Sequence, residues 1–221
     1  MPKIFQQFWW KGLGAFLVTY TVLGGFLFKA PRLVILNETI RVLHFHVPMW
    51  FGMIFIFTAS TYASFKYLKT QKLEYDRISK ELVETGCLFG VLGLLTGMFW
   101  ANYTWGEPWS GDAKQNTSAI SLLIYFASLI LRGSIQDDQQ KARLFSVYNI
   151  FAFALMIPLL FILPRMTDSL HPGNGGNPGF NAYDLDSNLR WVFYPAVVGW
   201  TLIGFWIASL KIRIAQLEQS S

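Results

Sequence analysis

Long apolar stretches, separated by short polar or charged segments, dominate the chain. Six stretches contain no Asp, Glu, Lys or Arg, and they are residues 12–28, 42–65, 85–106, 115–131, 144–164 and 191–210. An α-helix needs about 20 apolar residues to cross the hydrocarbon core of a bilayer, within a range of roughly 17–25. The pattern therefore predicts six membrane spans, at about 9–28, 47–66, 82–103, 115–132, 144–164 and 190–210.

Composition supports an all-α integral membrane protein that forms a single domain over residues 1–221. The chain is 53% hydrophobic and 17% aromatic but only 14% charged, whereas soluble domains carry about a quarter charged residues. The lone cysteine, Cys87, lies inside the third span. We expect it to be a small apolar filler and not a disulfide partner.

The distribution of Lys and Arg predicts how the six spans are oriented. Both termini and the second and fourth loops share one side, which holds 12 of the 18 cations, and the other side holds 6. The positive-inside rule places the richer side in the cytoplasm. Both termini are then cytoplasmic, and the first, third and fifth loops face outward. Because the cations are dispersed along the membrane flanks, the formal net charge of +5 does not indicate nucleic-acid binding.

Glycine, proline and polar residues predict features within the spans. In span three, glycines recur at every third or fourth residue and form a smooth stripe for helix packing: Gly86, Gly90, Gly93 and Gly97. Asn37 is a possible start of a short interfacial helix that leads into span two, and Pro48 suits the first turn of that span. Pro158 predicts a kink in span five. The polar start of span four is expected to face protein or water: Gln115, Asn116, Thr117, Ser118 and Ser121.

Two histidines and one polar-aromatic loop carry the candidate chemistry. His46 lies at the mouth of span two, and His171 lies in the fifth loop. The third loop contains Trp105, Trp109 and Asp112. On the predicted topology all of these are on the outer side. Haem is the ligand that this set suits, because it needs axial nitrogen ligands, flat apolar surfaces and cations for its propionates. The outer cations include Lys114, Arg41, Arg165 and Arg190.

Each of these residues also has a structural explanation. A lone interfacial histidine is more often a polar anchor than a ligand, and tryptophan at a bilayer surface usually belongs to the aromatic belt. Asp112 can cap span four. His44 is about 200° from His46 on a helix, so we expect that His44 is not a ligand. Zinc is a weaker alternative than haem, because no carboxylate or second histidine has ligand spacing.

The third loop resembles a known signature. The run Trp105-Gly106-x-x-Trp109-x-x-Asp112-Ala113-Lys114 resembles the tryptophan-rich signature of the haem-handling proteins of cytochrome c biogenesis. The chain is most similar to the six-span cytochrome c maturation protein C family, also called haem exporter protein C. The resemblance covers nearly the whole chain, including the span count and the segments His46-Val47-Pro48 and Leu170-His171.

The resemblance implies roles for particular residues. His46 and His171 would be the axial ligands of haem b, and the platform under the haem would consist of Trp105, Gly106, Trp109 and Asp112. Lys114 would pair with a propionate. The chain departs from the family signature at Pro108 and Gly111, where aromatic residues are usual, and at Lys114, where Arg is common.

The implied function is haem handling or export in cytochrome c biogenesis at the bacterial inner membrane, without enzymatic activity. The implied partners are a periplasmic haem chaperone of the cytochrome c maturation protein E type, the A and B subunits of an ABC transporter, and a small D subunit. Two other functions stay open. A haem lyase-type factor would attach haem to apocytochrome c, but such proteins have more spans and histidines. A small-solute transporter would need polar or ionisable groups at mid-span, and the span centres show almost none.

Overall fold

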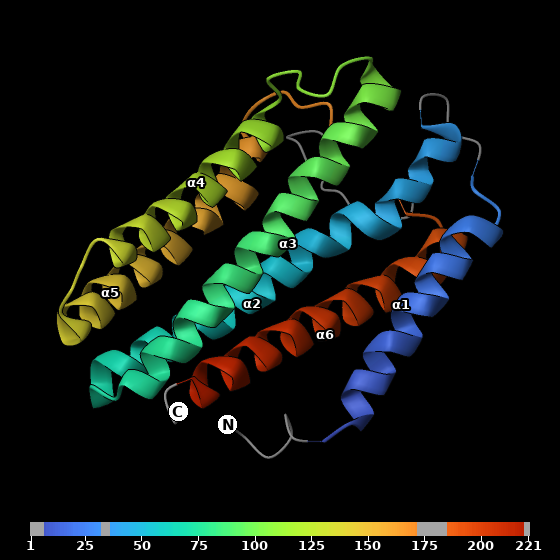
Figure 1. The fold of residues 1–221 in the computed structure, drawn as a ribbon. Helices are drawn as coiled ribbons and strands as arrows, with labels where there is room; N and C mark the ends of the chain where they lie inside the picture. Colours follow the sequence, from blue (N-terminus) through green and yellow to red (C-terminus); the bar gives the residue numbers. More distant parts are fainter. Residues whose placement is uncertain (1–6, 32–35, 172–184, 219–221) are drawn as a thin grey trace.

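A computed structural model describes residues 7–31, 36–171 and 185–218, and the regular structure in these ranges is helical. Six long helices form a bundle (Figure 1): α1 (Trp9–Leu27), α2 (Leu43–Thr70), α3 (Leu73–Trp105), α4 (Ala113–Gly133), α5 (Asp138–Ile157) and α6 (Ser187–Leu217). Three short segments are η2 (Asn37–Val42), η3 (Pro158–Ile162) and η4 (Leu163–Arg165). Six helical stretches are long and apolar enough to cross a membrane. The six predicted spans and the all-α fold class are therefore confirmed.

Several helices extend well beyond the predicted spans. The third span was expected from about residue 82, but α3 begins at Leu73 and contains 33 residues. At a rise of about 1.5 Å per residue, α3 is about 50 Å long, whereas the hydrocarbon core is only about 30 Å thick. Apolar stretches predict the membrane-crossing part of a helix, and α3 continues past that part as charged helical ends.

The start of α2 differs from the sequence prediction. Asn37–Val42 forms a 3₁₀-helix that joins α2 without a break, so the expected interfacial helix is not a separate element. Pro48 is the sixth residue of α2 and does not lie in its first turn, so that prediction is wrong. The segment has a buried apolar face, because Ile40 and Leu43 are buried in a cluster that also contains residues near the start of α6: Leu185, Leu189 and Phe193.

The glycine stripe of α3 packs against α2, as predicted. A methyl group added at Gly93 would lie 2.9 Å from the Trp50 ring, and one added at Gly97 would lie 2.6 Å from the His46 imidazole. Any larger side chain at these positions would push the helices apart. The stripe therefore sets the spacing of α2 and α3, the most extensively packed helix pair in the bundle.

The remaining helices surround this pair. Helix α6 packs against α1 and α2, while α5 packs against α2 and α4. The main core cluster includes Phe57 of α2 and Tyr125 of α4, whose rings stack with centroids 3.6 Å apart. As expected, the polar start of α4 faces the interior, with Gln115 and Ser121 buried; Asn116 is the exception and is exposed. At Pro158, the helix changes from α to π geometry, so the predicted irregularity in span five is present.

A buried polar cluster joins α2, α3 and α5, and the apolar span composition did not predict it. The Asn149 amide donates to the hydroxyl oxygens of three serines, which are Ser60, Ser64 and Ser79. All four side chains are fully buried. Such hydrogen bonds stabilise helix association in a membrane, where lipid tails are as apolar as the side chains and apolar burial gives little driving force.

A buried ion pair joins α3 to α4 at the end of the bundle that carries the α2–α3 turn. The Arg132 guanidinium donates two hydrogen bonds, of 2.6 Å and 2.7 Å, to the Asp76 carboxylate. It also lies 4.8 Å from the centre of the Phe145 ring of α5. Asp76 is only 3% exposed, so the carboxylate depends on Arg132 to replace water.

We expect Asp76→Asn to lower the free energy of unfolding by about 3 kcal/mol, because it leaves the Arg132 guanidinium, whose side chain is only 16% exposed, without its counter-ion. Glu74→Gln removes the same charge at an exposed position two residues away, and we expect it to change stability by less than about 0.5 kcal/mol. Equilibrium unfolding in detergent measures both. Equal effects of the two substitutions would contradict a stabilising role for the pair.

Candidate functional site

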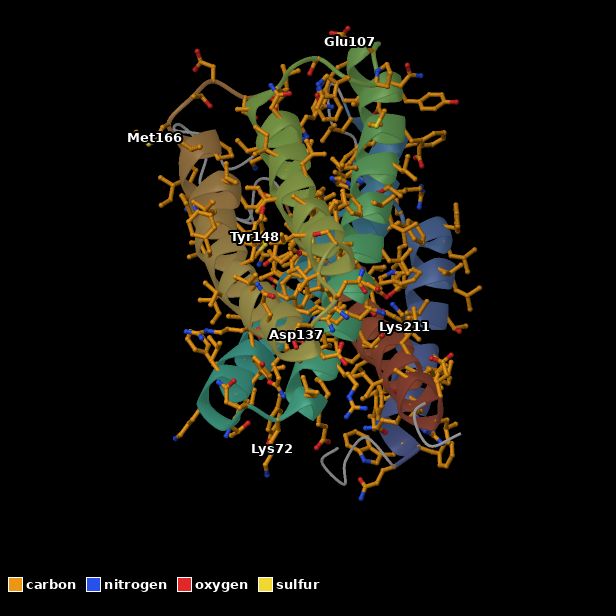
Figure 2. The ribbon with its side chains drawn as sticks, turned by 60° about the vertical axis from the view of Figure 1, so that its left-hand side comes forward. Lys72, Glu107, Asp137, Tyr148, Met166 and Lys211 are labelled. Atoms are coloured by element: carbon orange, nitrogen blue, oxygen red, sulfur yellow. The ribbon has the colours of Figure 1, made fainter. Side chains whose placement is uncertain are left out.

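The two candidate histidines and the third loop lie at one end of the bundle, here termed the histidine end. Figure 2 shows Glu107 and Met166 at this end and Lys72 and Asp137 at the opposite, terminus end. The histidine end contains the start of α2, the last turns of α3 and the start of α4. The segment that ends at His171 joins them through Asp112, so residues more than a hundred positions apart in sequence lie at this end.

His46 is held against the backbone of α3. Its Nδ1 lies 3.0 Å from the Gly93 carbonyl oxygen and 3.2 Å from the Thr96 hydroxyl oxygen. Thr96 donates its own proton to the Leu92 carbonyl at 2.7 Å, so both neighbours of Nδ1 act as acceptors. Nδ1 of His46 therefore carries the proton, and the lone pair that could bind a metal is on Nε2.

Aromatic rings and a glycine fix the orientation of the His46 imidazole, which is 9% exposed. The rings of Trp50 and Trp100 contact it edge-on, with centroids 6.3 Å and 5.9 Å away. Gly97 leaves room for the ring on its remaining side. The Trp100 indole N–H donates to Thr39 Oγ1 at 3.2 Å, and this hydrogen bond links the aromatic ring beside His46 to η2.

Asp112 caps α4 and also binds His171. Its Oδ1 accepts the backbone N–H of Lys114 at 2.8 Å and lies 2.9 Å from Nδ1 of His171. Its Oδ2 accepts the Ser169 hydroxyl and the Leu170 backbone N–H, both at 2.8 Å. The predicted capping role of Asp112 is therefore confirmed, and the same carboxylate also contacts His171.

The environment keeps Asp112 ionised. Burial alone would raise the pKa of this carboxyl group, but the hydrogen bond and charge of His171, with the donors of Leu170 and Ser169, lower it well below its ordinary value. A carboxylate only accepts hydrogen bonds, so Nδ1 of His171 carries a proton. The lone pair of a neutral His171 imidazole is then on Nε2, as in His46. A carboxylate behind the second ring nitrogen is the usual support of a metal-binding histidine.

The loop between α3 and α4 is shaped by two glycines and by side chains of α4. Gly106 and Gly111 have φ values of +88° and +72°, which residues with a Cβ rarely adopt. The Gln115 side chain accepts from the backbone N–H and hydroxyl of Ser110 and donates to the Pro108 carbonyl. The departures at positions 108 and 111 thus belong to a folded loop in which a tryptophan at 111 would be strained.

The other predicted site residues differ in how closely they approach the histidines. The Trp105 ring contacts the His171 ring edge-on, with centroids 4.8 Å apart. Trp109 is 37% exposed, and its ring makes no contact with another aromatic ring in the described part of the chain. The charges of His171 and Lys114 both act on His46.

Two of the expected outer cations are occupied elsewhere. Arg41 donates to three carbonyl oxygens at the end of α1, at 2.7–3.1 Å, and therefore caps that helix. The Nε of Arg190 donates to the Leu185 carbonyl. Arg165 is exposed. Arg41 and Arg190 are thus engaged by backbone carbonyl oxygens and less available to a ligand between the histidines than the sequence suggested.

Sequence reasoning missed several residues that position the histidines: Trp50, Thr96, Trp100 and Ser169. Trp50 could have been found, because it lies four residues after His46 and so shares its helix face. The other three depend on packing between elements. The described residues contain no group of three or more His, Cys, Asp or Glu side chains that could hold a bare metal ion.

These features define a class of protein: a six-helix membrane protein that holds two imidazoles and a tryptophan-bearing loop at one end of its bundle. The profile of the Heme exporter protein C family matches residues 3–221. The chain belongs to this family.

Individual relatives agree with this assignment. A Heme exporter protein C from Bradyrhizobium diazoefficiens is 26% identical over 135 residues, which are 61% of this chain and 51% of the relative. The Escherichia coli K12 Heme exporter protein C is 22% identical over 177 residues, 80% of this chain and 70% of the relative. An Arabidopsis thaliana protein described as a putative cytochrome c biosynthesis ccmC-like mitochondrial protein is 34% identical over 89 residues, 40% of this chain and 35% of the relative.

The lowered pKa of Asp112 predicts a loss of stability in acid. An unfolded Asp carboxyl titrates near pH 4 (about 3.9), so the stability that this carboxylate contributes is complete above about pH 4 and is lost as the pH falls toward its lower folded pKa. Asp112→Asn keeps a good helix cap but has no carboxylate to protonate. We expect the wild type to be more stable near neutral pH and to lose this advantage below about pH 4. Thermal unfolding across this range measures it, and parallel curves would contradict the prediction.

Proposed function

We propose that this chain holds haem b at the histidine end and passes it on during cytochrome c maturation. One observation carries the proposal: two imidazoles from distant segments lie at the same end of the bundle, and each has its Nδ1 proton bound by an acceptor. His46 uses the Gly93 carbonyl, and His171 uses the Asp112 carboxylate. Each neutral ring then presents its Nε2 lone pair, which is the form that ligates haem iron.

The two imidazoles would approach the iron from different depths. His46 packs beside Gly97 and His171 beside Trp105. These α3 residues are eight positions apart, which is about 12 Å along the helix axis. His46 would bind from the bundle side and His171 from the loop side, so that movement of the loop alone could release the haem.

The surrounding residues suit the rest of the haem molecule. Trp105, Trp109 and Gly106 would offer the flat surface against which a porphyrin packs. Lys114 would pair with a propionate, because its charge is already felt at His46. Asp112 would act as a positioning residue, which fixes His171 without touching the haem.

The histidine end would face the periplasm across the bacterial inner membrane, since most Lys and Arg residues flank the other end of the spans. The similarity to Heme exporter protein C of other bacteria supports a component that handles haem and is not itself an enzyme. We infer that haem passes to a periplasmic chaperone of the cytochrome c maturation protein E type, with the A, B and D subunits of the same system as membrane partners.

The ligand assignment is tested by the absorption spectrum of purified protein loaded with haem. We expect a low-spin spectrum with two nitrogen ligands in the wild type. His171→Ala and His46→Ala should each remove one ligand and weaken haem retention by at least about tenfold. His44→Ala is the matched control, because the third histidine lies on another face of α2, and its spectrum should match the wild type. A wild-type spectrum in either ligand variant would refute the assignment.

Partner capture separates the proposal from a haem lyase. Haem-loaded protein should retain the periplasmic chaperone and not apocytochrome c. Retention of apocytochrome c in place of the chaperone would favour the lyase.

The glycine contact at His46 provides a second prediction. Gly97→Ala would press a methyl group against the imidazole, so we expect haem affinity to fall by about tenfold or more, as overpacking typically costs 1–3 kcal/mol. Gly86→Ala crowds Phe57 instead, on the same helix but away from the site. It should lower thermal stability while the folded fraction keeps the wild-type haem spectrum. Haem titration and thermal unfolding of both variants measure the difference.

A further inference from the structure

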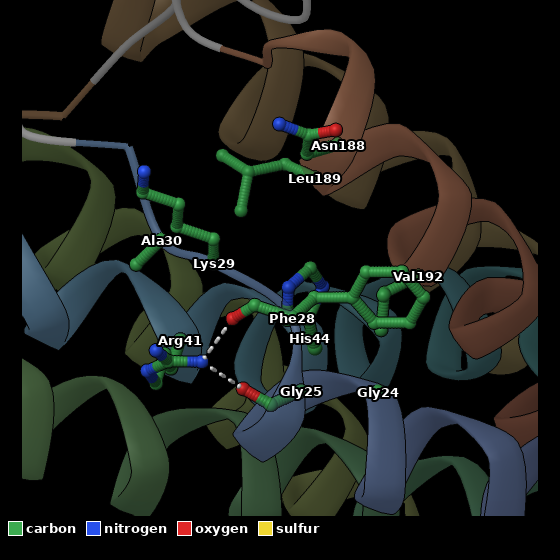
Figure 3. Close-up of a pocket in the computed structure, with 10 residues that line it drawn as sticks. All are labelled: Gly24, Gly25, Phe28, Lys29, Ala30, Arg41, His44, Asn188, Leu189 and Val192. Carbon is green, nitrogen blue, oxygen red and sulfur yellow. Dashed lines mark hydrogen bonds between the residues drawn. The ribbon is translucent and has the colours of Figure 1, made fainter.

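A small pocket lies on the side of α2 away from His46, between the end of α1, the start of α2 and the start of α6 (Figure 3). Its lining includes Gly25, Phe28, Lys29, Arg41, His44 and Leu189. The cavity volume is about 10 Å³, which is close to the minimum for one water molecule. One oxygen atom fits in its depth, and any larger group must extend out through the opening.

The polar group inside this pocket is His44. Its side chain is 3% exposed, and Nδ1 is buried without a hydrogen-bond partner among the described residues. Figure 3 shows the imidazole among the lining residues, beside Phe28 and Val192. A buried polar nitrogen without a partner is unfavourable, so the pocket is suited to a ligand that supplies an acceptor or donor at this atom.

The charged groups around the pocket favour a ligand whose hydrogen-bond acceptor carries a negative charge. Lys29 is exposed at the rim and forms no ion pair in the part of the chain that the structure describes. Arg41 also lines the pocket, but its charge is balanced by Glu38 and by the carbonyl oxygens of α1. The N-terminus of α6 adds no uncompensated positive end, because the Asp186 carboxylate caps it and accepts the Leu189 backbone N–H. No Asp or Glu lines the pocket among the described residues.

Apolar surface continues from the pocket along α1. Phe26 and Leu27, in its last turn, are 66% and 79% exposed, and α1 is one of the helices apolar enough to cross a membrane. A ligand that combines a negative oxygen with long hydrocarbon chains would satisfy both surfaces. A free phosphate ion offers the same oxygen but would leave the apolar surface without a matching partner.

We propose that this pocket binds the phosphate of an anionic phospholipid. One phosphate oxygen accepts a hydrogen bond from Nδ1–H of His44, and a second pairs with the Lys29 ammonium at the rim. The acyl chains lie along Phe26 and Leu27. The bound lipid would join α1, α2 and α6 at the histidine end, on the opposite side of α2 from the proposed haem ligand.

Two substitutions and one matched control test the site. Lys29→Gln removes the rim charge at an exposed position, and His44→Phe removes the buried donor while it keeps a flat ring. Lys72→Gln removes the same charge at the terminus end, where Lys72 is also exposed and forms no ion pair among the described residues. The probe is phosphatidylglycerol, added to delipidated wild type and variants. Native mass spectrometry counts the lipids that remain bound, and thermal unfolding measures the stabilisation.

We expect one tightly retained phosphatidylglycerol in the wild type and in Lys72→Gln, and at least about tenfold weaker retention in Lys29→Gln and in His44→Phe. Phosphatidylcholine should be retained less well than phosphatidylglycerol, and inorganic phosphate should not raise the unfolding temperature. Equal lipid retention in Lys29→Gln and wild type would overturn the proposal. Stabilisation by inorganic phosphate alone would overturn the assignment to a lipid. The haem spectrum of Lys29→Gln should be that of the wild type, so this test is independent of the proposed haem function.

Discussion

The Asp112 carboxylate is the interaction on which the histidine end depends. It is the N-cap residue just before α4, and it binds three successive residues of the segment that follows α5, which are Ser169, Leu170 and His171. A neutral side chain could cap the helix, and a neutral acceptor could bind one imidazole. Only a carboxylate has enough acceptor positions to take four donors at once. Its lowered pKa keeps the carboxylate ionised near neutral pH.

His46 is fixed by a different principle. Its partners are a backbone carbonyl and a glycine on α3, so its position is set by the distance between two helix backbones. The glycine stripe creates that distance along the whole α2–α3 pair. Gly97 therefore has two roles: it lets α2 and α3 pack closely, and it leaves room for the His46 imidazole.

The sequence predicted much of this structure, because hydrocarbon thickness limits what an apolar run can become. Span count, the Gly93–Gly97 packing face and the irregularity at Pro158 all follow from local spacing. The position of Pro48 did not, since a proline within a helix and a proline in its first turn look alike in sequence. The Asn149–serine cluster was not predicted either, because its four polar residues lie on three different helices and their contacts form only in the folded bundle. At the site, residue types identified His46, His171 and Asp112, whereas Thr96, Trp100 and Ser169 depend on tertiary contacts.

The contacts of His46 and the contacts of His171 can form at different times during synthesis. The contacts of His46 lie within one helical hairpin and are complete once α3 has emerged and inserted beside α2. The contact between Asp112 and His171 joins residues 59 positions apart and must wait until α4 and α5 are both in place. Since chains fold as they are made, starting from the N-terminus, the deeper half of the site precedes the outer half. A chain that stops before residue 171 would carry one imidazole in place and no second one, so the completed pair marks a fully inserted bundle.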